Sequence, residues 1–292
     1  VLADVVNQLR EKGAGIIVIP ILFSEYDRLG GDETFINTIH QNGVVIAQVG
    51  TNQTNKNSVP RGVAKIGDPL PWLFEWNGML GPVKEFGEYA DGVGVTNTAP
   101  EVDGVVRRIP LLMKIGDDIY PAMAIEVIRV ATGAPSYQVK TGDGGIIAMR
   151  VPGFDTINTD ANARIWLRWN KSYITTSIAD LDKEEVSLKG KTVIIGMNAE
   201  GLGGIIATPV GEKYAYELTA STLSTVLDGK NIKRVDISFI SELAVSFILG
   251  VTLILITRFM PYWVIGLKLI SWYIIAIYLS HYFFTKHLML VD

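Results

Sequence analysis

The residues with the clearest chemical potential lie in a Gly-rich loop at residues 196–204, directly after the apolar run at 191–197. Phosphate-binding loops occupy such positions between a strand and a helix. The P-loop pattern, however, requires Lys and a hydroxyl residue where Leu202 and Gly203 stand, and the dinucleotide pattern requires a small residue where Ile206 stands. We therefore interpret these glycines first as a tight turn, with a ligand site as the alternative.

Other residue types that could perform chemistry are scarce. The chain has no cysteine, which excludes a disulfide scaffold, a thiolate zinc site and a cysteine nucleophile. His40 is the one histidine before the C-terminal apolar region, and we interpret it as a surface or capping residue. Neighbouring carboxylates such as Asp117 and Asp118 are typical of solvated turns. We predict no catalytic residue, no metal and no cofactor, and a membrane-tethered hydrolase ranks last among the functions considered.

Charge and hydropathy restrict the partners. The net charge is −4 and no block dense in Lys and Arg occurs, so nucleic-acid binding has no support. Residues 237–256 and 262–284 are apolar stretches with one charge each, Glu242 and Lys268. As helices they would reach about 30 and 35 Å, enough to cross a bilayer. The short break between them predicts a transmembrane hairpin, and a third apolar run begins at Leu288.

The remaining chain alternates strand and helix patterns, which predicts an α/β domain with a mixed, largely parallel sheet. The chain opens inside a helical pattern, so we expect it to be part of a longer protein. A polar surface excursion is expected at 50–70, and short strands at 137–170. Strands are expected at 15–20, 44–49, 92–97, at 105–115 with a break at Pro110, and most clearly at 191–197. Helices are expected at 32–42, 120–132 and 215–227.

Several segments together resemble the second type of CHASE domain, a sensory module associated with cyclases and histidine kinases. The matching segments are DGVVRRIPL at 103–111, YPAMAIE at 120–126, KGKTVIIG at 189–196, GLG at 201–203 and ATPVG at 207–211. The pair DGVVRR and YPA is the more specific part of the likeness. The likeness covers nearly the whole chain, including the membrane hairpin.

The resemblance implies a sensory domain at 1–234, in the periplasm or outside the cell, followed by membrane helices at 235–292. One membrane helix would precede the domain and about three would follow it in the cytoplasmic membrane. A cyclase or kinase output domain would lie beyond the chain. The partners would be the membrane, an unknown small-molecule or protein ligand, and a second copy in a homodimer or other proteins of a membrane complex.

The candidate functional residues come from the matched segments and the loop around them. Asp103 and Glu126 are interpreted as ion-pair partners of the two arginines, holding the β-segment to the following helix. Gly229 and Arg234 are expected to connect the helix at 215–227 to the first span. The candidate ligand-binding residues are Arg107, Arg108, Asn198, Gly201, Gly203 and Thr208.

We expect a receptor that transmits binding through the helix at 215–227 and the juxtamembrane segment. The alternative is a degenerate sensory fold that serves as a non-catalytic subunit of a membrane assembly. Pro20, Gly204 and Leu218 favour the alternative, because relatives often carry an acidic residue, Asp and His there.

Overall fold

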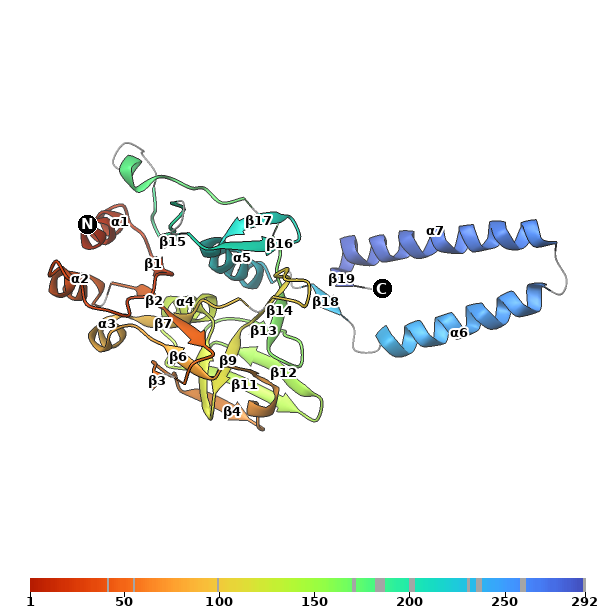
Figure 1. The fold of residues 1–292 in the computed structure, drawn as a ribbon, viewed down its shortest axis with the longest axis horizontal. Coiled ribbons are helices and arrows are strands. Elements are labelled where there is room, and N and C mark those ends of the chain that lie inside the picture. Colours follow the sequence, from red (N-terminus) through yellow and green to blue (C-terminus); the bar gives the residue numbers. More distant parts are fainter. Residues whose placement is uncertain are drawn as a thin grey trace. The chain divides into compact units, whose positions relative to one another are not determined.

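The computed structural model describes the chain in two compact units, Val1–Gly229 and Lys230–Asp292. We call them the N-terminal unit and the C-terminal unit (Figure 1). The sequence-based boundary at 234/235 lies a few residues further along. The structure describes all residues except 41, 55, 99, 170–171, 182–186, 200–202, 230–231, 235–237, 258–260 and 291–292, and only the backbone of residues 56–57, 233–234, 238–239, 241–242, 256–257 and 262.

A parallel sheet forms the centre of the N-terminal unit. Its parallel strands lie in the order β15 (Thr192–Ile194), β1 (Ile16–Ile19), β2 (Val44–Thr51) and β7 (Gly92–Val95). The far end of β2 also pairs antiparallel with β6 (Gly78–Leu80), which pairs with β3 (Lys56–Asn57). The expected mixed α/β fold with a parallel strand–helix–strand unit is confirmed.

Both faces of the parallel sheet are covered, because successive strand residues point to opposite faces. Ile17 and Ile19 of β1 join the core formed with α1 (Leu2–Glu11), α2 (Asp32–Ile39) and α3 (Lys84–Tyr89). Val18 joins the core of the opposite face, which α4 (Met123–Thr132) and α5 (Ala215–Leu227) complete. In Figure 1, α1, α2 and α3 lie together, and α4 and α5 lie on the other side of the strands.

Shorter strands extend the unit beyond the parallel sheet. β8 (Arg108–Pro110) pairs with β14 (Arg164–Trp166), and β9 (Leu112–Ile115) pairs with β10 (Asp118–Pro121) and β5 (Phe74–Glu75). A further sheet contains β4 (Val63–Ile66), β11 (Tyr137–Gly142), β12 (Gly145–Arg150) and β13 (Thr156–Ile157). β16 (Ile205–Thr208) and β17 (Gly211–Tyr214) form a hairpin before α5. Two 3-10 turns occupy Leu70–Trp72 and Ile178–Asp180.

One sequence-based helix boundary was wrong. The helix expected from residue 120 begins at Met123, because Tyr120 and Pro121 belong to β10 and pair with Met113 and Leu112. The segment 50–70 lies largely at the surface, as expected, and it also contains the short strands β3 and β4, which pair with β6 and β11. Pairing with distant strands decides where these strands form, and local sequence does not report it.

The C-terminal unit contains the helices α6 (Ser238–Thr257) and α7 (Tyr262–His287), which run side by side (Figure 1). Among the described residues, one stretch, Trp263–His287, is long and apolar enough to cross a membrane. The apolar stretch of α6, Leu243–Leu255, is shorter, and residues 235–237 lie outside the described part. The hairpin is therefore confirmed only in part. The apolar run from 288 forms β19 (Met289–Leu290), paired with β18 (Lys233–Arg234), and not the start of a third helix.

Candidate functional site

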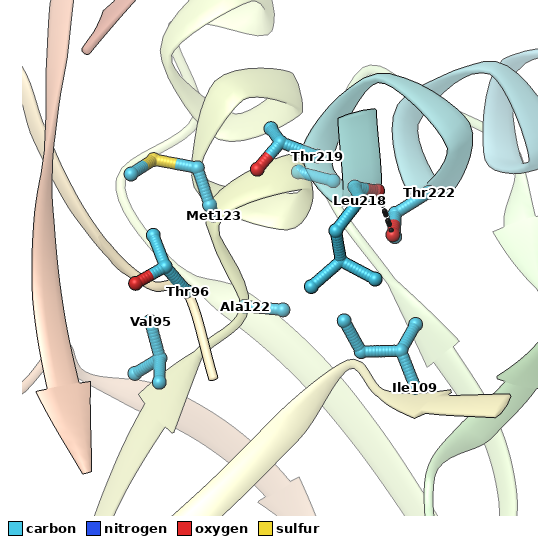
Figure 2. A pocket seen from close by; sticks show the side chains of 9 residues that line it. Val95, Thr96, Ile109, Ala122, Met123, Leu218, Thr219 and Thr222 are labelled. Atoms are coloured by element: carbon cyan, nitrogen blue, oxygen red, sulfur yellow. Dashed lines mark hydrogen bonds between the residues drawn. The ribbon is translucent and has the colours of Figure 1, made fainter. Parts of the chain in front are cut away.

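A small cavity lies at the carboxyl edge of the parallel sheet, where β7 ends. Its lining comes from four elements: the end of β7, the start of α4, the N-terminal half of α5 and one residue of β8. Open α/β sheets bind ligands beyond the carboxyl ends of their strands, which makes this edge the first place to look. Figure 2 shows Leu218 and Ile109 facing each other across the cavity. The lining residues are Val95, Thr96, Ile109, Ala122, Met123, Ala124, Leu218, Thr219 and Thr222.

On one side of the cavity, α4 packs directly against the backbone of β7, with no space for a side chain between them. A Cβ at Gly94 would lie 2.4 Å from the Cα of Met123, so only glycine permits this backbone approach. A Cβ at Gly92 would lie 2.7 Å from Cγ of Glu126. Ala122, just before α4, forms a bridge with Val95 and donates its N–H to the carbonyl of Leu111 at 2.9 Å. The start of α4 is therefore fixed to β7 and to Leu111, the residue between β8 and β9.

Glu126 anchors α4 further through a buried network. Its side chain is 0% exposed and accepts hydrogen bonds from the Val93 N–H at 3.2 Å, from Arg61 at 3.2 Å, from Arg129 at 2.9 Å and from the Tyr137 hydroxyl. Burial, followed by the charge of Glu126, raises the pKa of Tyr137 far above its ordinary value, so its hydroxyl remains a donor. Burial alone would lower the pKa of Arg129, but its bond to Glu126 raises it.

The expected pairing of Glu126 with Arg107 or Arg108 is wrong. Asp103 does bind Arg107, through two hydrogen bonds of 2.9 and 2.7 Å, but both residues lie in one turn. The helix is held to its surroundings by Arg61 and Tyr137, which bind Glu126, and by Arg129 of α4 itself, which also donates to the carbonyl of Asp91. Arg61 and Tyr137 lie outside the matched motif, which is why the motif alone did not identify them.

Both candidate arginines are engaged by the chain itself. The Arg107 guanidinium holds the pKa of Asp103 down at about 2. Arg108 donates two hydrogen bonds to Glu101 at 2.6 and 2.7 Å, which lowers the pKa of Glu101. Arg108 also lies 5.0 Å from the ring centre of Trp166. A ligand would have to displace carboxylates that already satisfy these two guanidinium groups.

The Gly-rich loop follows β15 at the same edge of the sheet. A Cβ at Gly203 would lie 2.7 Å from the carbonyl oxygen of Met197, so this glycine closes a tight turn. Asn198 is exposed, and Gly201 lies outside the described residues. A Cβ at Gly196 would lie 2.4 Å from the ring of Tyr216, which stacks on the ring of Tyr214. The loop therefore packs against the start of α5.

Thr208 lies next to this loop, in the β16–β17 hairpin. It is buried, its hydroxyl donates to the carbonyl of Gly211, and the same oxygen accepts the N–H of Val210 at 3.3 Å. The N–H of Val106 donates to the carbonyl of Ala207 at 2.9 Å, which joins the segment of the two arginines to the hairpin. The structure thus brings two matched segments together, but Thr208 serves the turn.

α5 meets the cavity with hydroxyl side chains. Thr222 donates to the carbonyl of Leu218 at 2.7 Å, and Thr225 donates to the carbonyl of Ser221 at 2.6 Å, so both are satisfied inside their own helix. Thr225 also accepts the N–H of Arg168 at 3.2 Å. The buried polar residues of α5 are Thr219, Ser221, Thr222 and Thr225. The repeated Ser and Thr residues in an otherwise apolar helix are the sequence signal that could have indicated this side of the cavity.

The two transmission candidates lie in different units. Gly229 follows α5 with φ of +62°, a left-handed conformation that glycine adopts readily. Arg234 belongs to β18, with its backbone opposite Leu290, and its side chain lies outside the described part. α5 ends at Leu227, and the chain reaches α6 at Ser238.

The described residues contain no group of three or more His, Asp or Glu side chains that could hold a metal ion. His40 caps the C-terminal end of α2, as expected, and its ring lies 5.3 Å from that of Tyr89.

The sequence profile of the CHASE2 domain family matches residues 1–274, which include the whole N-terminal unit, α6 and half of α7. The chain belongs to the CHASE2 family. CHASE2 domains are extracytoplasmic sensory domains, which is consistent with the sensory function expected for this chain. No curated protein and no solved structure matches it. The cavity and the Glu126 network are therefore known from the structure of this chain and not from a relative.

Proposed function

We propose that this chain is the membrane-anchored sensory part of a signal-transduction receptor. A ligand or partner protein bound by the N-terminal unit shifts α5, and α5 displaces α6. The observation that carries the proposal is the difference between the two helices at the cavity. α4 leaves no room for a Cβ on β7, whereas α5 packs across a cavity with hydroxyl groups that bond within their own helix. Moving α5 would leave the bonds of Thr222 and Thr225 to their own helix in place and would exchange its contacts with Arg168, Tyr173 and Gly204. Moving α4 would instead break the fully buried network of Glu126.

The position of α5 in the chain supports the same mechanism. Its first residue, Ala215, donates its N–H to the carbonyl of Gly204 at 2.7 Å, so the Gly-rich loop is tied to its N-terminus. Its C-terminus continues through Gly229 towards α6. A ligand at the loop would shift the equilibrium by its differential affinity for the two positions of α5. Asn198, Gly201 and Gly203 are the candidate contacts, and Arg107, Arg108 and Thr208 would contribute only by exchanging partners.

The family resemblance implies where in the cell the receptor would act and what it would control. The N-terminal unit would lie in the periplasm or outside the cell, anchored in the cytoplasmic membrane, with a cyclase or kinase output domain beyond residue 292. Displacement of α6 would be read by a second copy, so the receptor would be a homodimer. Residues 1–292 contain no cysteine, so single thiols introduced among them can report sidedness and the contact between copies.

Sidedness is tested with a membrane-impermeant thiol reagent on intact cells. Ile147 on β12 is 55% exposed, so Ile147→Cys should be labelled from outside. Thr257→Cys, at the end of α6, should be labelled only after the membrane is opened. The reverse pattern would place the sensory unit in the cytoplasm and would contradict the proposal.

Transmission is tested by cross-linking copies in the membrane through Leu243→Cys, Phe247→Cys or Val251→Cys, three exposed positions on α6. Leu223→Ala should then loosen the packing of α5, because Leu223 is buried in the core of its face. We expect the cross-linking rate at one or more of these positions to change severalfold. Ile147→Ala, an exposed change on β12, is the control and should leave the rate unchanged. Equal rates in both variants would show that α5 does not move α6.

A second function, a non-catalytic subunit of a membrane assembly, is favoured by one observation. Arg107, Arg108 and Thr208, three of the candidate ligand residues, are satisfied by groups of the chain itself. Purification of the native protein in mild detergent separates the two functions. Other proteins present in fixed ratio, with no output domain on the same polypeptide, would support the assembly subunit.

A further inference from the structure

A polar stripe follows the C-terminal half of α5. It contains Ser221, Ser224 and Thr225 of the helix and Asp228, the residue directly after it, and their spacing places them on one face. Ser221 is 2% exposed and Thr225 is 1% exposed. Polar groups that lose contact with water need hydrogen-bond partners, because an unpaired one is destabilising. The partners of this stripe therefore show what holds this part of α5 in place.

Arg168, which follows β14, binds the end of the stripe. Its backbone N–H donates to the hydroxyl oxygen of Thr225 at 3.2 Å, while Thr225 donates its own proton to the carbonyl of Ser221 at 2.6 Å. The guanidinium of Arg168 lies 3.7 Å from the carboxylate of Asp228, and these two side chains are 30% and 35% exposed. Arg168 thus contacts the last turn of α5 through its backbone and through its side chain.

Tyr173 binds the middle of the same stripe. Its hydroxyl donates to the hydroxyl oxygen of Ser221 at 3.3 Å and lies 3.2 Å from the hydroxyl oxygen of Ser224. A phenol hydroxyl can donate one hydrogen bond and accept others, so one tyrosine serves both serines. We call Arg168 and Tyr173 the clasp, because together they contact α5 and its cap from residue 221 to residue 228.

The clasp is anchored on the segment that resembles the family motif. The N–H of Leu167 donates to the carbonyl of Arg107 at 2.9 Å, and the indole N–H of Trp169 donates to the carbonyl of Val106 at 2.9 Å. Trp169 is 5% exposed, so its bond is shielded from water. Arg168 lies between these two anchors and is directed by them towards α5.

We propose that the clasp is a releasable latch that holds α5 in the position seen here. This inference rests on the proposed function, in which a shift of α5 moves α6. The clasp contacts are partly exposed, so water can replace them when α5 shifts. The carboxylate of Glu126, which is 0% exposed, has no such exchange available. The clasp therefore sets part of the differential affinity that a ligand must have to move α5.

The clasp also connects the turn of the two arginines to α5. The backbone carbonyls of Val106 and Arg107 hold the residues on either side of Arg168. A ligand or partner that displaced this turn would draw the clasp away from α5 without contacting the helix. The motif would then control α5 through its backbone, although the guanidinium of Arg107 is bound to Asp103.

Tyr173→Phe provides the first test, because phenylalanine keeps the ring and removes the hydroxyl. Loss of a hydrogen bond changes an equilibrium constant by about two- to tenfold. We expect the cross-linking rate through the α6 thiols to change by about that factor, in the same direction as with Leu223→Ala. Tyr26→Phe is the matched control: Tyr26 donates to Glu85 at 2.7 Å in an exposed loop, and its loss should leave the rate unchanged.

Thermal unfolding distinguishes a latch from a purely structural contact. A latch changes the cross-linking rate of the folded protein. A structural contact would lower the melting temperature of Tyr173→Phe and leave the cross-linking rate equal to that of Tyr26→Phe, and this result would overturn the inference.

A charge exchange tests the second half of the clasp. Asp228→Arg places two like charges together and should change the cross-linking rate in the same direction as Tyr173→Phe. Arg168→Glu combined with Asp228→Arg restores opposite charges and should return the rate towards that of the unchanged protein. A double variant no closer to the unchanged protein than Asp228→Arg alone would contradict the pair.

Should these variants fail to fold, amide hydrogen exchange in the unchanged protein gives a second measurement. The N–H of Arg168 should exchange slowly, because it is bonded to Thr225. Exchange as fast as in an unfolded chain would refute the clasp.

The two proposals fail in different ways. Unchanged cross-linking in the clasp variants, with Leu223→Ala still active, would refute the latch and leave transmission through α5 intact. A rate that responded neither to Leu223→Ala nor to the clasp variants would refute transmission through α5, and the latch that rests on it.

Discussion

Substitution of Glu126 by Gln should reveal how strongly the buried network fixes α4. Glu126 is fully buried and binds two arginines, a tyrosine hydroxyl and one backbone N–H. Glutamine keeps the size of the side chain and one acceptor oxygen. It removes the negative charge and places an NH2 group among groups that are all donors.

The expected loss of unfolding free energy is estimated from Arg129, which loses its negatively charged partner. Arg129 is 12% exposed and would keep only its bonds to the carbonyls of Asp91 and Ala134. Removing one partner of a buried ion pair costs about 3–5 kcal/mol. Because glutamine can still accept one or two of the hydrogen bonds, we expect the lower end, about 3 kcal/mol. For a unit of this size, that loss lowers the melting temperature by about 6–12 °C.

The assay is thermal unfolding of the full chain in mild detergent, followed by circular dichroism. Glu88→Gln is the matched control, because the side chain of Glu88 is 59% exposed and its carboxylate lies 3.6 Å from the ammonium group of Lys84, which is 79% exposed. Surface pairs of this kind contribute about 0–1 kcal/mol. If Glu126→Gln destabilised the protein no more than Glu88→Gln, the buried network would not hold α4, and the distinction drawn between α4 and α5 would lose its main support.

Two other predictions concern the backbone approach at β7 and the turn of the two arginines. Gly94→Ala would place a Cβ 2.4 Å from the Cα of Met123, and we expect the free energy of unfolding to fall by about 3 kcal/mol. Gly144→Ala is the control, because no atom lies within 4 Å of its Cβ, and it should change the free energy of unfolding by less than about 0.5 kcal/mol. A carboxyl titration by NMR should give Asp103 a pKa of about 2, and Arg107→Gln should return it towards the ordinary value of about 3.9. Because the folded-state pKa is lowered, the stabilising contribution of this pair is present above about pH 4 and is lost as the pH falls towards 2. An unshifted pKa in the unchanged protein would show that Arg107 and Asp103 do not pair in solution.

Much of the secondary structure followed from local patterns. The helix expected at 215–227 matches α5, Ala215–Leu227, and its end is marked in the sequence by Asp228-Gly229. The strands at β1, β2 and β7 were recognisable as short apolar runs of the kind buried on both faces. Strands that pair over long distances were missed, as with β4, whose partner β11 begins more than seventy residues later.

The candidate site was predicted less well. The sequence motifs predicted a ligand site built mainly from arginine and glycine residues, because these residue types define the motifs. The structure shows that the arginines bind neighbouring acids, and that the cavity is lined by threonines and apolar residues. Thr96 and Thr219 are ordinary residues separated by more than one hundred positions. No local signal connects them.

The sequence by itself determined the class of the fold, the apolar C-terminal helices and the membership of the CHASE2 family. These depend on residue patterns of short range: periodicity, apolar length and motif. Only the tertiary structure decided that Glu126 binds Arg61 and Tyr137, and that α4 is rigidly seated whereas α5 faces a cavity. Those properties depend on which distant side chains fill the same space, and packing of that kind is settled only when the whole chain has folded.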